Sequence, residues 1–167
     1  MQDDAAVEEF LREGYRRVVG AVALVSGSLD SAEDAVQEAI VRAWERSASK
    51  PEIVSIERWV VTVALNLSRS RIRRLVVERR AWPRLVQPDP PQSDPDSMDV
   101  RRALERLPRR QREAVVLRYY LDLDVREVAV VMQVEEGTAK STLARAREAL
   151  RHQLRLPDSE VETDANR

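Results

Sequence analysis

The side chains of this chain that could do chemistry gather near its C-terminus, in the stretch EEGTAKSTLARAREALR from Glu135 to Arg151. Leu143, Ala146 and Leu150 recur at three- and four-residue steps, which predicts the apolar stripe of an amphipathic helix. The other side is small and basic, suited to DNA base edges, a thymine methyl group and, near the helix N-terminus, a phosphate. A solvated basic helix is the alternative. The residues assigned to this side are Lys140, Ser141, Ala144 and Arg145, with Thr138 beside the phosphate.

A second basic segment favours a nucleic-acid partner. Between Arg69 and Arg84 there are seven arginines and one acid, Glu78, so the segment carries a net charge of +6, although the whole chain carries −1. Taken alone, it would be an ordinary charged helix end, since arginine near a helix C-terminus also suits the helix dipole. Two basic surfaces together add phosphate contacts and are better explained by a nucleic-acid footprint.

Catalytic chemistry finds little support in the residue types. His152 is the only histidine, cysteine is absent, and the sequence has no phosphate-binding glycine loop and no Ser, His and Asp grouping. Glu33, Asp34 and Glu38 could form a carboxylate metal site, but no histidine is near them. We therefore expect no enzyme activity, no catalytic residues, no metal and no cofactor.

The elements that must position these side chains are predicted to be helices. Apolar residues repeat at helical steps in both halves, and glycine is rare, with 4 in 167 residues. Five of the eight prolines fall between Pro83 and Met98, a stretch with almost no apolar content. The predicted fold is all-α, with two small helical domains joined by a Pro-rich flexible linker. The domains span 5–82 and 99–155, the linker spans 83–98, and 156–167 is expected to be a disordered tail.

Two amphipathic helices are predicted in the first domain. The stretch DSAEDAVQEAIVRAWER has Ser31 as its expected N-cap, with Asp34 three residues later. Trp44 and Trp59 are predicted to be core aromatics. The first helix buries Ala32, Ala35, Val36, Ala39 and Ala43, and its solvated face carries Asp34, Gln37 and Glu38. The second, IERWVVTVALNLSRSRIRR, buries Ile56, Trp59, Val60, Val63 and Leu67, and another face carries Thr62, Asn66, Arg69 and Arg73.

The second domain has the pattern of a helix-turn-helix. Pro108 suits the first position of a helix whose inner side is Ala114, Leu117 and Leu121. A short helix, VREVAVVM, then leads through the turn QVEE into the basic helix described above. In this motif the second helix enters the DNA major groove. The short helix is predicted to pack through Val125, Val128, Ala129 and Met132.

The sequence also indicates a compartment. The chain opens with the acidic stretch MQDDAAVEEF, and its longest apolar run, VVGAVALV, is too short to span a bilayer. The absence of cysteine suits a reducing environment. We expect a soluble, cytoplasmic protein.

Three stretches, in order, resemble the extracytoplasmic-function (ECF, group 4) sigma factors of the sigma-70 family of bacterial RNA polymerase. They are DSAEDAVQEAIVRAWER, WVVTVALNLSRSRIRR and LPRRQREAVVLRYYLDLDVREVAVVMQVEEGTAKSTLARAREALR. The resemblance covers roughly residues 8–82 and 99–154. It implies a promoter-specificity subunit that binds core RNA polymerase, recognises the minus-ten and minus-thirty-five elements of promoter DNA, and directs transcription initiation.

The resemblance also implies roles for individual residues. Asp34, Gln37 and Glu38 would dock on the beta-prime clamp helices of core polymerase, and the second domain would meet the beta flap. An anti-sigma factor is a common further partner in the family. The minus-ten element, with a flipped base, would be held by Asn66, Arg69, Arg73, Trp59 and Lys50. The minus-thirty-five element would be read by Lys140, Ser141, Ala144 and Arg145, with Thr138, Arg118 and Arg126 on the DNA backbone.

This sequence departs from the family pattern at a few positions. Gln133 stands where glycine is usual in the helix-turn-helix, Glu135 stands where a better N-cap is common, and Thr142 replaces a usual arginine. The residues alone leave two alternatives. One is a free-standing helix-turn-helix regulator that binds DNA without polymerase, and the other is a helical protein-interaction module.

Overall fold

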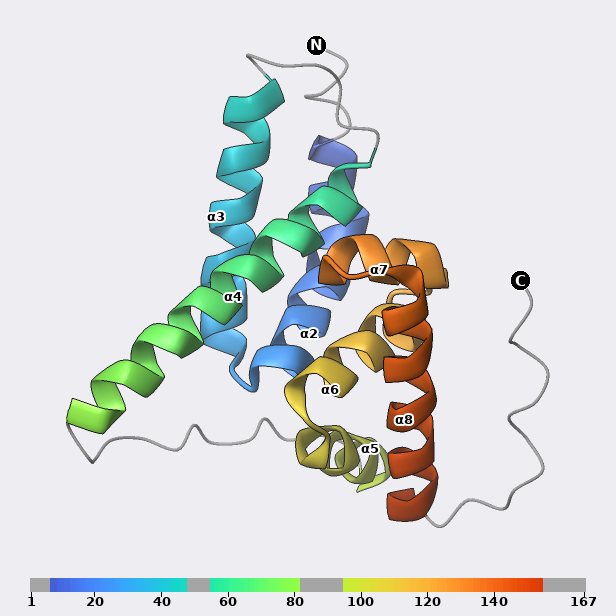
Figure 1. Cartoon of the computed structure of the whole chain (residues 1–167). Helices are drawn as coiled ribbons and strands as arrows, with labels where there is room; N and C mark the ends of the chain where they lie inside the picture. Colours follow the sequence, from blue (N-terminus) through green and yellow to red (C-terminus); the bar gives the residue numbers. More distant parts are fainter. Residues whose placement is uncertain (1–6, 48–54, 82–94, 155–167) are drawn as a thin grey trace. The chain divides into compact units, whose positions relative to one another are not determined.

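The computed structural model describes the backbone of residues 7–47, 55–81 and 95–154, and their side chains apart from residues 47, 72–81 and 95–98. Every element in these ranges is a helix, which confirms the all-α prediction (Figure 1). The chain divides into two compact units, Met1–Pro90 and Pro91–Arg167. Most of the predicted linker and the predicted tail lie outside the described residues. The predicted linker end at residue 98 is wrong, because helix α5 already begins at Pro95, where proline lacks only an N–H that has no intrahelical partner.

The first unit is built from η1 (Phe10–Gly14), α2 (Tyr15–Ser26), α3 (Leu29–Ser47) and α4 (Ile56–Ala81). Helices α2, α3 and α4 pack against one another in all three pairings. Small and β-branched side chains fill the space between them, and these let the helices approach closely. The five α3 residues that were predicted to face inward are all buried. The buried residues are Val18, Val22 and Val25 of α2, Ala32, Ala35, Val36, Ala39 and Ala43 of α3, and Val60, Val61, Ala64 and Leu65 of α4.

The start of α3 lies before the predicted position. Gly27 has a φ of 80°, in the left-handed region that suits glycine, and its N–H donates to the carbonyl of Ala23, which ends α2. Ser28 then follows at the N-cap, and its hydroxyl accepts from the N–H of Ser31 at 3.3 Å. The prediction of Ser31 as the N-cap is therefore wrong. It failed because Gly27 ends one helix so sharply that the next begins three residues earlier.

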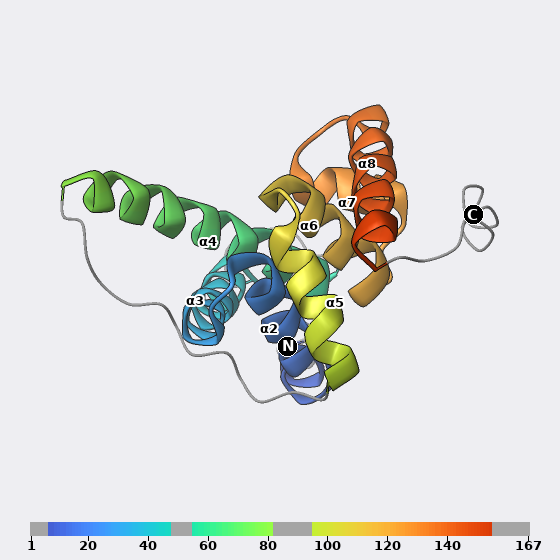
Figure 2. The ribbon, with the colours of Figure 1, turned by 90° about the horizontal axis from the view of Figure 1, so that it is seen from below.

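The buried stripe of α4 is rotated relative to the prediction. Ile56 and Val60 are buried as expected, but Trp59, Val63 and Leu67 are only partly buried. The buried positions continue instead through Val61, Ala64, Leu65 and Ser68, because α4 contacts both α2 and α3 and so buries a wider face. The C-terminal part of α4 extends beyond α2 and α3 in both ribbon views (Figures 1 and 2).

The second unit comprises α5 (Pro95–Arg106), α6 (Arg109–Val115), η2 (Val116–Tyr120), α7 (Val125–Met132) and α8 (Glu136–Leu154). Helix α8 packs against α5, α6 and α7, and so is the central helix of the unit. Pro108 is the N-cap of α6 rather than its first residue. Val125 and Leu150, predicted to pack inward, are only half-buried. The buried residues include Leu104, Leu107, Ala114, Leu117, Leu121, Val128, Ala129, Val131, Met132, Ala139, Leu143 and Ala146.

An arginine closes the C-terminal end of α5. The Nη2 of Arg112 donates to the carbonyl of Glu105 at 2.8 Å and to that of Leu107 at 3.3 Å. These carbonyls lie at a helix end, where they lack intrahelical donors and the dipole favours a cation. Burial lowers the pKa of Arg112 from its ordinary value, and the charge of Glu105 opposes that shift. The arginine thus fixes the corner between α5 and α6.

Candidate nucleic-acid interface

Helices α7 and α8 form the helix-turn-helix. Asp124 caps α7: its carboxylate accepts from the N–H of Glu127 at 2.8 Å, and the Glu127 carboxylate accepts from the N–H of Asp124 at 2.9 Å. Gln133 ends α7 with a φ of 57°. This left-handed conformation explains why glycine is usual there, since a side chain at such a position is strained. After the turn, α8 begins at Glu136.

One side of α8 is buried and the other is exposed. Ala139, Leu143 and Ala146 pack into the unit. The five α8 residues predicted to meet DNA are all exposed, and they follow one another along the N-terminal half of the helix. These residues are Thr138, Lys140, Ser141, Ala144 and Arg145. Of the predicted packing stripe, Leu143 and Ala146 are buried and Leu150 is not, while the residues predicted to meet DNA lie on the exposed side.

The hydroxyl groups on this face are turned back to the helix. The Oγ of Ser141 donates to the Thr138 carbonyl at 3.0 Å, and the Oγ1 of Thr142 donates to the same oxygen at 2.7 Å. A hydroxyl that gives its proton to the backbone still has lone pairs to offer. Ser141 can therefore accept from an exocyclic base amine without losing its bond to Thr138.

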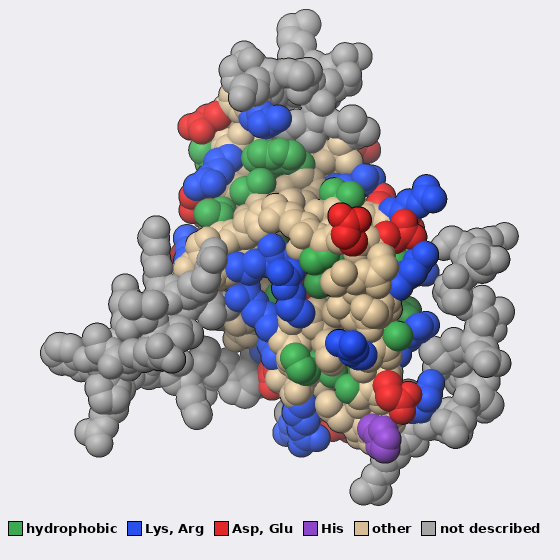
Figure 3. Space-filling view, in the orientation of Figure 1, with side chains coloured by type: hydrophobic (Ala, Val, Ile, Leu, Met, Phe, Trp, Pro, Cys, Tyr) green, Lys and Arg blue, Asp and Glu red, His purple; other side chains and the backbone are tan. Residues whose placement is uncertain are grey.

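Lys140 and Arg126, which are both predicted to contact DNA, pair with the carboxylate of Glu136. The Nζ of Lys140 lies 2.8 Å from Oε1 of Glu136, and the Nε of Arg126 lies 3.5 Å from Oε2 of the same group. The hydrogen bond from Lys140 and its charge, assisted by Arg126, hold the pKa of Glu136 below its ordinary value. Acidic and basic side chains are interspersed over α7 and α8 in the space-filling view (Figure 3). The face therefore carries less net positive charge than its lysine and arginines suggest.

Arg118, another predicted backbone contact, is held inside the second unit. Its side chain is only 15% exposed, and its Nη1 donates to the carbonyl of Leu123 at 3.3 Å. The guanidinium also lies 3.7 Å from the Asp122 carboxylate and 5.7 Å from the centroid of the Tyr119 ring. Through these contacts Arg118 holds the loop that precedes α7 in place. They also leave its guanidinium less free to bind a phosphate.

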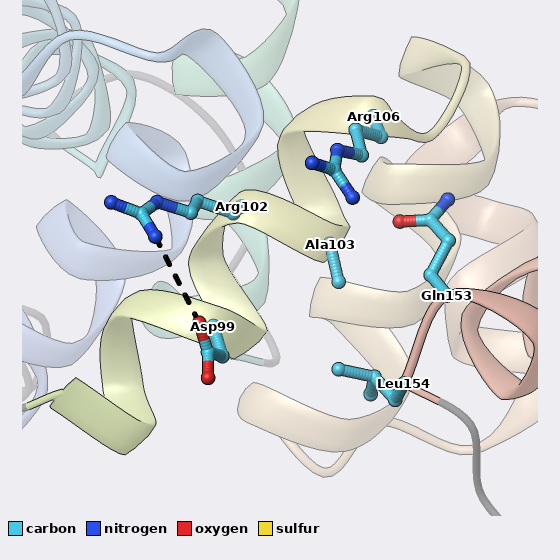
Figure 4. A pocket seen from close by; sticks show the side chains of 6 residues that line it. All are labelled: Asp99, Arg102, Ala103, Arg106, Gln153 and Leu154. Atoms are coloured by element: carbon cyan, nitrogen blue, oxygen red, sulfur yellow. Dashed lines mark ion pairs between the residues drawn. The ribbon is translucent and has the colours of Figure 1, made fainter.

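A pocket of about 300 Å³ lies between α5 and the C-terminal end of α8 (Figure 4). Its one carboxylate, Asp99, pairs with Arg102 at 3.9 Å. The helix rises about 1.5 Å per residue, so Gln153 at the pocket lies about 25 Å along α8 from Glu136. The pocket is therefore separate from the recognition face. Its lining is Asp99, Arg102, Ala103, Arg106, Gln153 and Leu154.

The predicted minus-ten residues lie partly on α4. Asn66 and Arg69 are one turn apart, and the Oδ1 of Asn66 accepts from Nη1 of Arg69 at 2.7 Å. This bond orients the asparagine so that its amide N–H groups are left to donate. Trp59 is partly buried on the same helix. Lys50 and the side chain of Arg73 lie outside the described residues. Among the described ones, Asn66 and Arg69 are in contact, and Trp59 lies two turns before Asn66 on the same helix.

The predicted acidic face of α3 is connected to α4. Arg71 of α4 places Nη1 at 3.4 Å from Oδ2 of Asp34 and Nη2 at 3.8 Å from Oε2 of Glu38. Arg42 pairs with Glu38 from one turn along α3. Two of the three carboxylates considered for a metal site, Asp34 and Glu38, thus pair with arginines. No cluster of three or more His, Asp or Glu fit to hold a metal occurs among the described residues.

Sequence reasoning missed two apolar residues on α3. Val41 is 56% exposed and Trp44 is 53% exposed, so the prediction of Trp44 as a core aromatic is wrong. Val41 follows Gln37 by four residues and Glu38 by three, and Trp44 follows Val41 by three. This face of α3 is therefore acidic near Glu38 and becomes apolar toward Val41 and Trp44. Extending the helical spacing from Gln37 would have found both residues.

None of the described helices combines the length and the apolar content that crossing a bilayer requires.

Comparison with known proteins assigns both units. Residues 10–76 match the family model of sigma-70 region 2, and residues 97–150 match that of sigma-70 region 4. The chain is therefore a protein of the sigma-70 family. This family acts in transcription without being enzymatic.

The relatives define the branch of the family. The ECF RNA polymerase sigma factor SigM of Mycobacterium tuberculosis is 31% identical over 150 residues, which cover 89% of this chain and 76% of the relative. The ECF RNA polymerase sigma factor RpoE of Cereibacter sphaeroides is 30% identical over 171 residues, covering 92% and 88%. The chain belongs to the ECF sigma factors. It directs RNA polymerase in promoter recognition and transcription initiation.

A solved structure has a similar helical fold. It is the sigma factor RpoE of Bartonella quintana in complex with the anti-sigma factor NepR, with a TM-score of 0.75 and 25% sequence identity. The match covers 89% of this chain and 96% of that one.

Proposed function

We propose that α8 recognises the minus-thirty-five element, α4 recognises the minus-ten element, and α3 docks on core RNA polymerase. The observation that carries this proposal is the continuous exposure of Thr138, Lys140, Ser141, Ala144 and Arg145 on one side of a helix whose other side is buried. That arrangement is what a recognition helix needs to enter a major groove.

Within the minus-thirty-five contact, the residues divide by chemistry. Lys140 and Arg145 can donate to guanine, Ser141 can accept from a base amine or donate, and Ala144 can contact a thymine methyl group. Thr138 is exposed in the first turn of α8, where backbone N–H groups favour a phosphate. Arg126 is 83% exposed and suits a second phosphate. The limited reach of Arg118 gives it a smaller part, through the position of its loop.

The minus-ten contact is assigned to Trp59, Asn66, Arg69 and Arg73 of α4, with Lys50 from the segment before this helix. Unstacking a base costs a few kcal/mol, and aromatic stacking recovers about 1–3 kcal/mol per base. The partial burial of Trp59 supports a role as one wall of a base pocket. The bond between Asn66 and Arg69 supports a joint role in donating to a base and a phosphate.

The polymerase contact is assigned to Asp34, Gln37 and Glu38, extended by Val41 and Trp44. Interfaces draw most of their affinity from a few buried aromatic and charged anchors surrounded by polar residues. The exposed Trp44 and Val41 beside two carboxylates have that composition. The expected partner surface is a basic and apolar helical pair, as the beta-prime clamp helices would provide. The second unit is proposed to meet the beta flap.

An anti-sigma factor is proposed as a further partner. The support is the structural relative, which is bound to an anti-sigma factor. Since RNA polymerase and chromosomal DNA are cytoplasmic in bacteria, the protein is proposed to act there.

The experiment is a core-polymerase binding assay followed by run-off transcription on sheared genomic DNA. Asp34→Arg should reduce binding to core polymerase without unfolding the protein. Glu8→Arg, at an exposed acid of the first unit outside α3, is the charge-matched control and should leave that binding unchanged. The wild type should give discrete starts that share two upstream elements. A folded Asp34→Arg variant that binds core polymerase as the wild type does would overturn the α3 assignment.

A further inference from the structure

Glu136 is an acid in the middle of a surface assigned to DNA. It is the first residue of α8, and its carboxylate joins Lys140 at 2.8 Å to Arg126 at 3.5 Å. All three side chains reach solvent, with 39% of the Glu136 side chain exposed. A negative charge here repels phosphates, and it occupies the helix N-terminus, where a phosphate would otherwise be favoured.

The pairing affects base contacts and phosphate contacts differently. The ammonium of Lys140 has three donors, and a bond to Glu136 uses one of them, so two remain for the acceptors of a guanine edge. Lys140 can therefore contact a base without leaving Glu136. A phosphate that bonds Lys140 while the lysine keeps Glu136 brings two anions together around one cation, and a lysine that leaves Glu136 for the phosphate loses the 2.8 Å ion pair. The ion pair between Lys140 and Glu136 therefore disfavours contacts with the DNA backbone more than contacts with the bases.

Pairing with Glu136 also limits the contacts of Arg126 with DNA phosphates. Its Nε is the atom that approaches Glu136, and its side chain is 83% exposed, so it can still donate to a group in solvent. It can bind one phosphate in that geometry, while the carboxylate lowers the net attraction for a phosphate at any other position. The two pairs together hold the cations at defined places on the recognition face.

We propose that Glu136 is a specificity-determining residue, whose carboxylate holds Lys140 at the base edges and opposes sequence-independent binding to the DNA backbone. This inference rests on the proposed function, in which α8 recognises the minus-thirty-five element. It also gives a reason, beyond the preference of a helix N-terminus for an acid, for a negative charge at a place where attraction to DNA would favour a neutral or basic residue.

The test is binding of the assembled holoenzyme to two duplexes. One is a promoter fragment found by run-off transcription, and the other is the same fragment with only its minus-thirty-five element scrambled. The variant is Glu136→Gln, which keeps the size of the side chain and removes its charge. The matched control is Glu148→Gln, which removes one acid from the same helix, where Glu148 pairs with Arg151 at 2.9 Å. Dissociation constants are measured over a range of salt concentrations.

Glu136→Gln should strengthen binding to the scrambled duplex by about three- to tenfold and to the native duplex by less, so the ratio of the two affinities falls. The slope of log K against log salt should steepen by about one, because one more phosphate is neutralised. Glu148→Gln should change each affinity by less than twofold. Unchanged affinities, or equal changes on both duplexes, would overturn the proposal, and weaker binding to both would instead make Glu136 a structural support of α8.

The proposed function is tested separately in the same assay. Lys140→Ala and Arg145→Ala should lose affinity for the native duplex whatever Glu136 does. If neither variant loses affinity, α8 is not the recognition helix, and the function assigned to it fails. If both lose affinity while Glu136→Gln keeps the wild-type ratio, only the role of Glu136 fails.

Discussion

Arg71 of α4 reaches α3, where its Nη1 lies 3.4 Å from Oδ2 of Asp34. The same nitrogen donates to the carbonyl of Ser31 at 3.4 Å, and the other terminal nitrogen approaches Glu38. Arg71 belongs to the arginine-rich segment that was interpreted as one DNA surface. Its position opposite Asn66 on the helix turns it toward the polymerase face instead. One arginine therefore ties the two proposed surfaces of the first unit together.

Arg71→Ala should lower the stability of the first unit without weakening DNA binding. The ion pair is partly exposed, so the expected cost is at most about 1 kcal/mol in the free energy of unfolding. Urea unfolding measures this cost, and the salt dependence of promoter binding by the holoenzyme measures the phosphate contacts. Arg69→Ala is the control and should flatten the salt dependence by about one phosphate. A similar flattening with Arg71→Ala would make Arg71 a DNA contact.

Trp44→Ala should weaken binding to core polymerase. An exposed tryptophan that becomes buried at the centre of an interface commonly contributes about 2 kcal/mol or more, which corresponds to roughly 30-fold in Kd. Because the side chain is 53% exposed in the free protein, the fold should tolerate its loss. Leu11→Ala, at a similarly exposed apolar residue of η1, is the control and should keep the wild-type affinity. A folded Trp44→Ala protein with unchanged Kd would remove Trp44 from the interface.

Gln133→Gly should stabilise the second unit. The left-handed conformation of Gln133 costs about 1–2 kcal/mol for a residue with a side chain, and the extra freedom of glycine in the unfolded chain offsets about 0.4–1 kcal/mol of that. A net gain of up to about 1.6 kcal/mol is expected in thermal or urea unfolding. Gln133→Ala keeps the strain, so it should give no gain. Equal stabilisation by both variants would point to the glutamine side chain rather than the backbone.

The carboxyl group of Glu136 should titrate below the ordinary range for glutamate. The hydrogen bond and charge of Lys140 stabilise the ionised form in the folded protein, so the folded pKa is lowered. The resulting contribution to stability is present above the pKa of the unfolded chain and is lost as pH falls through the lowered folded pKa. In an NMR titration, Lys140→Met should raise the Glu136 midpoint, and Ser141→Ala should not. An unchanged midpoint in Lys140→Met would mean that the pair does not persist in solution.

The helical fold and most of its inner face could be predicted from the sequence, because periodicity reports burial directly. The alanines of α3 and the buried side of α8 follow this rule. The errors arose where tertiary packing decides. Trp59 and Val63 were predicted to be buried, yet α4 turns Val61 and Leu65 inward because it packs on two helices. Trp44 was assigned to the core on residue type alone, but its position on α3 leaves it 53% exposed.

The candidate site could be predicted in part. The exposed residues of α8 followed from their spacing, since the same pattern that predicts the packing face leaves them outside. The pairing of Glu136 with Arg126 could not be predicted, because the partners lie on different helices across the turn. The link between Arg71 and Asp34 spans 37 positions, and it depends on how α4 crosses α3, which local spacing does not fix.

The most direct test of the account is transcription from a promoter library with a randomised minus-thirty-five element. Holoenzymes carrying the wild type, Arg145→Ala or Arg126→Ala transcribe the library, and sequencing of the transcripts gives the preference at each position. Arg145→Ala should relax the preference at one base position by about 1–3 kcal/mol, whereas Arg126→Ala should reduce transcription across all sequences alike. Equal losses on every sequence for both variants would contradict base recognition by α8.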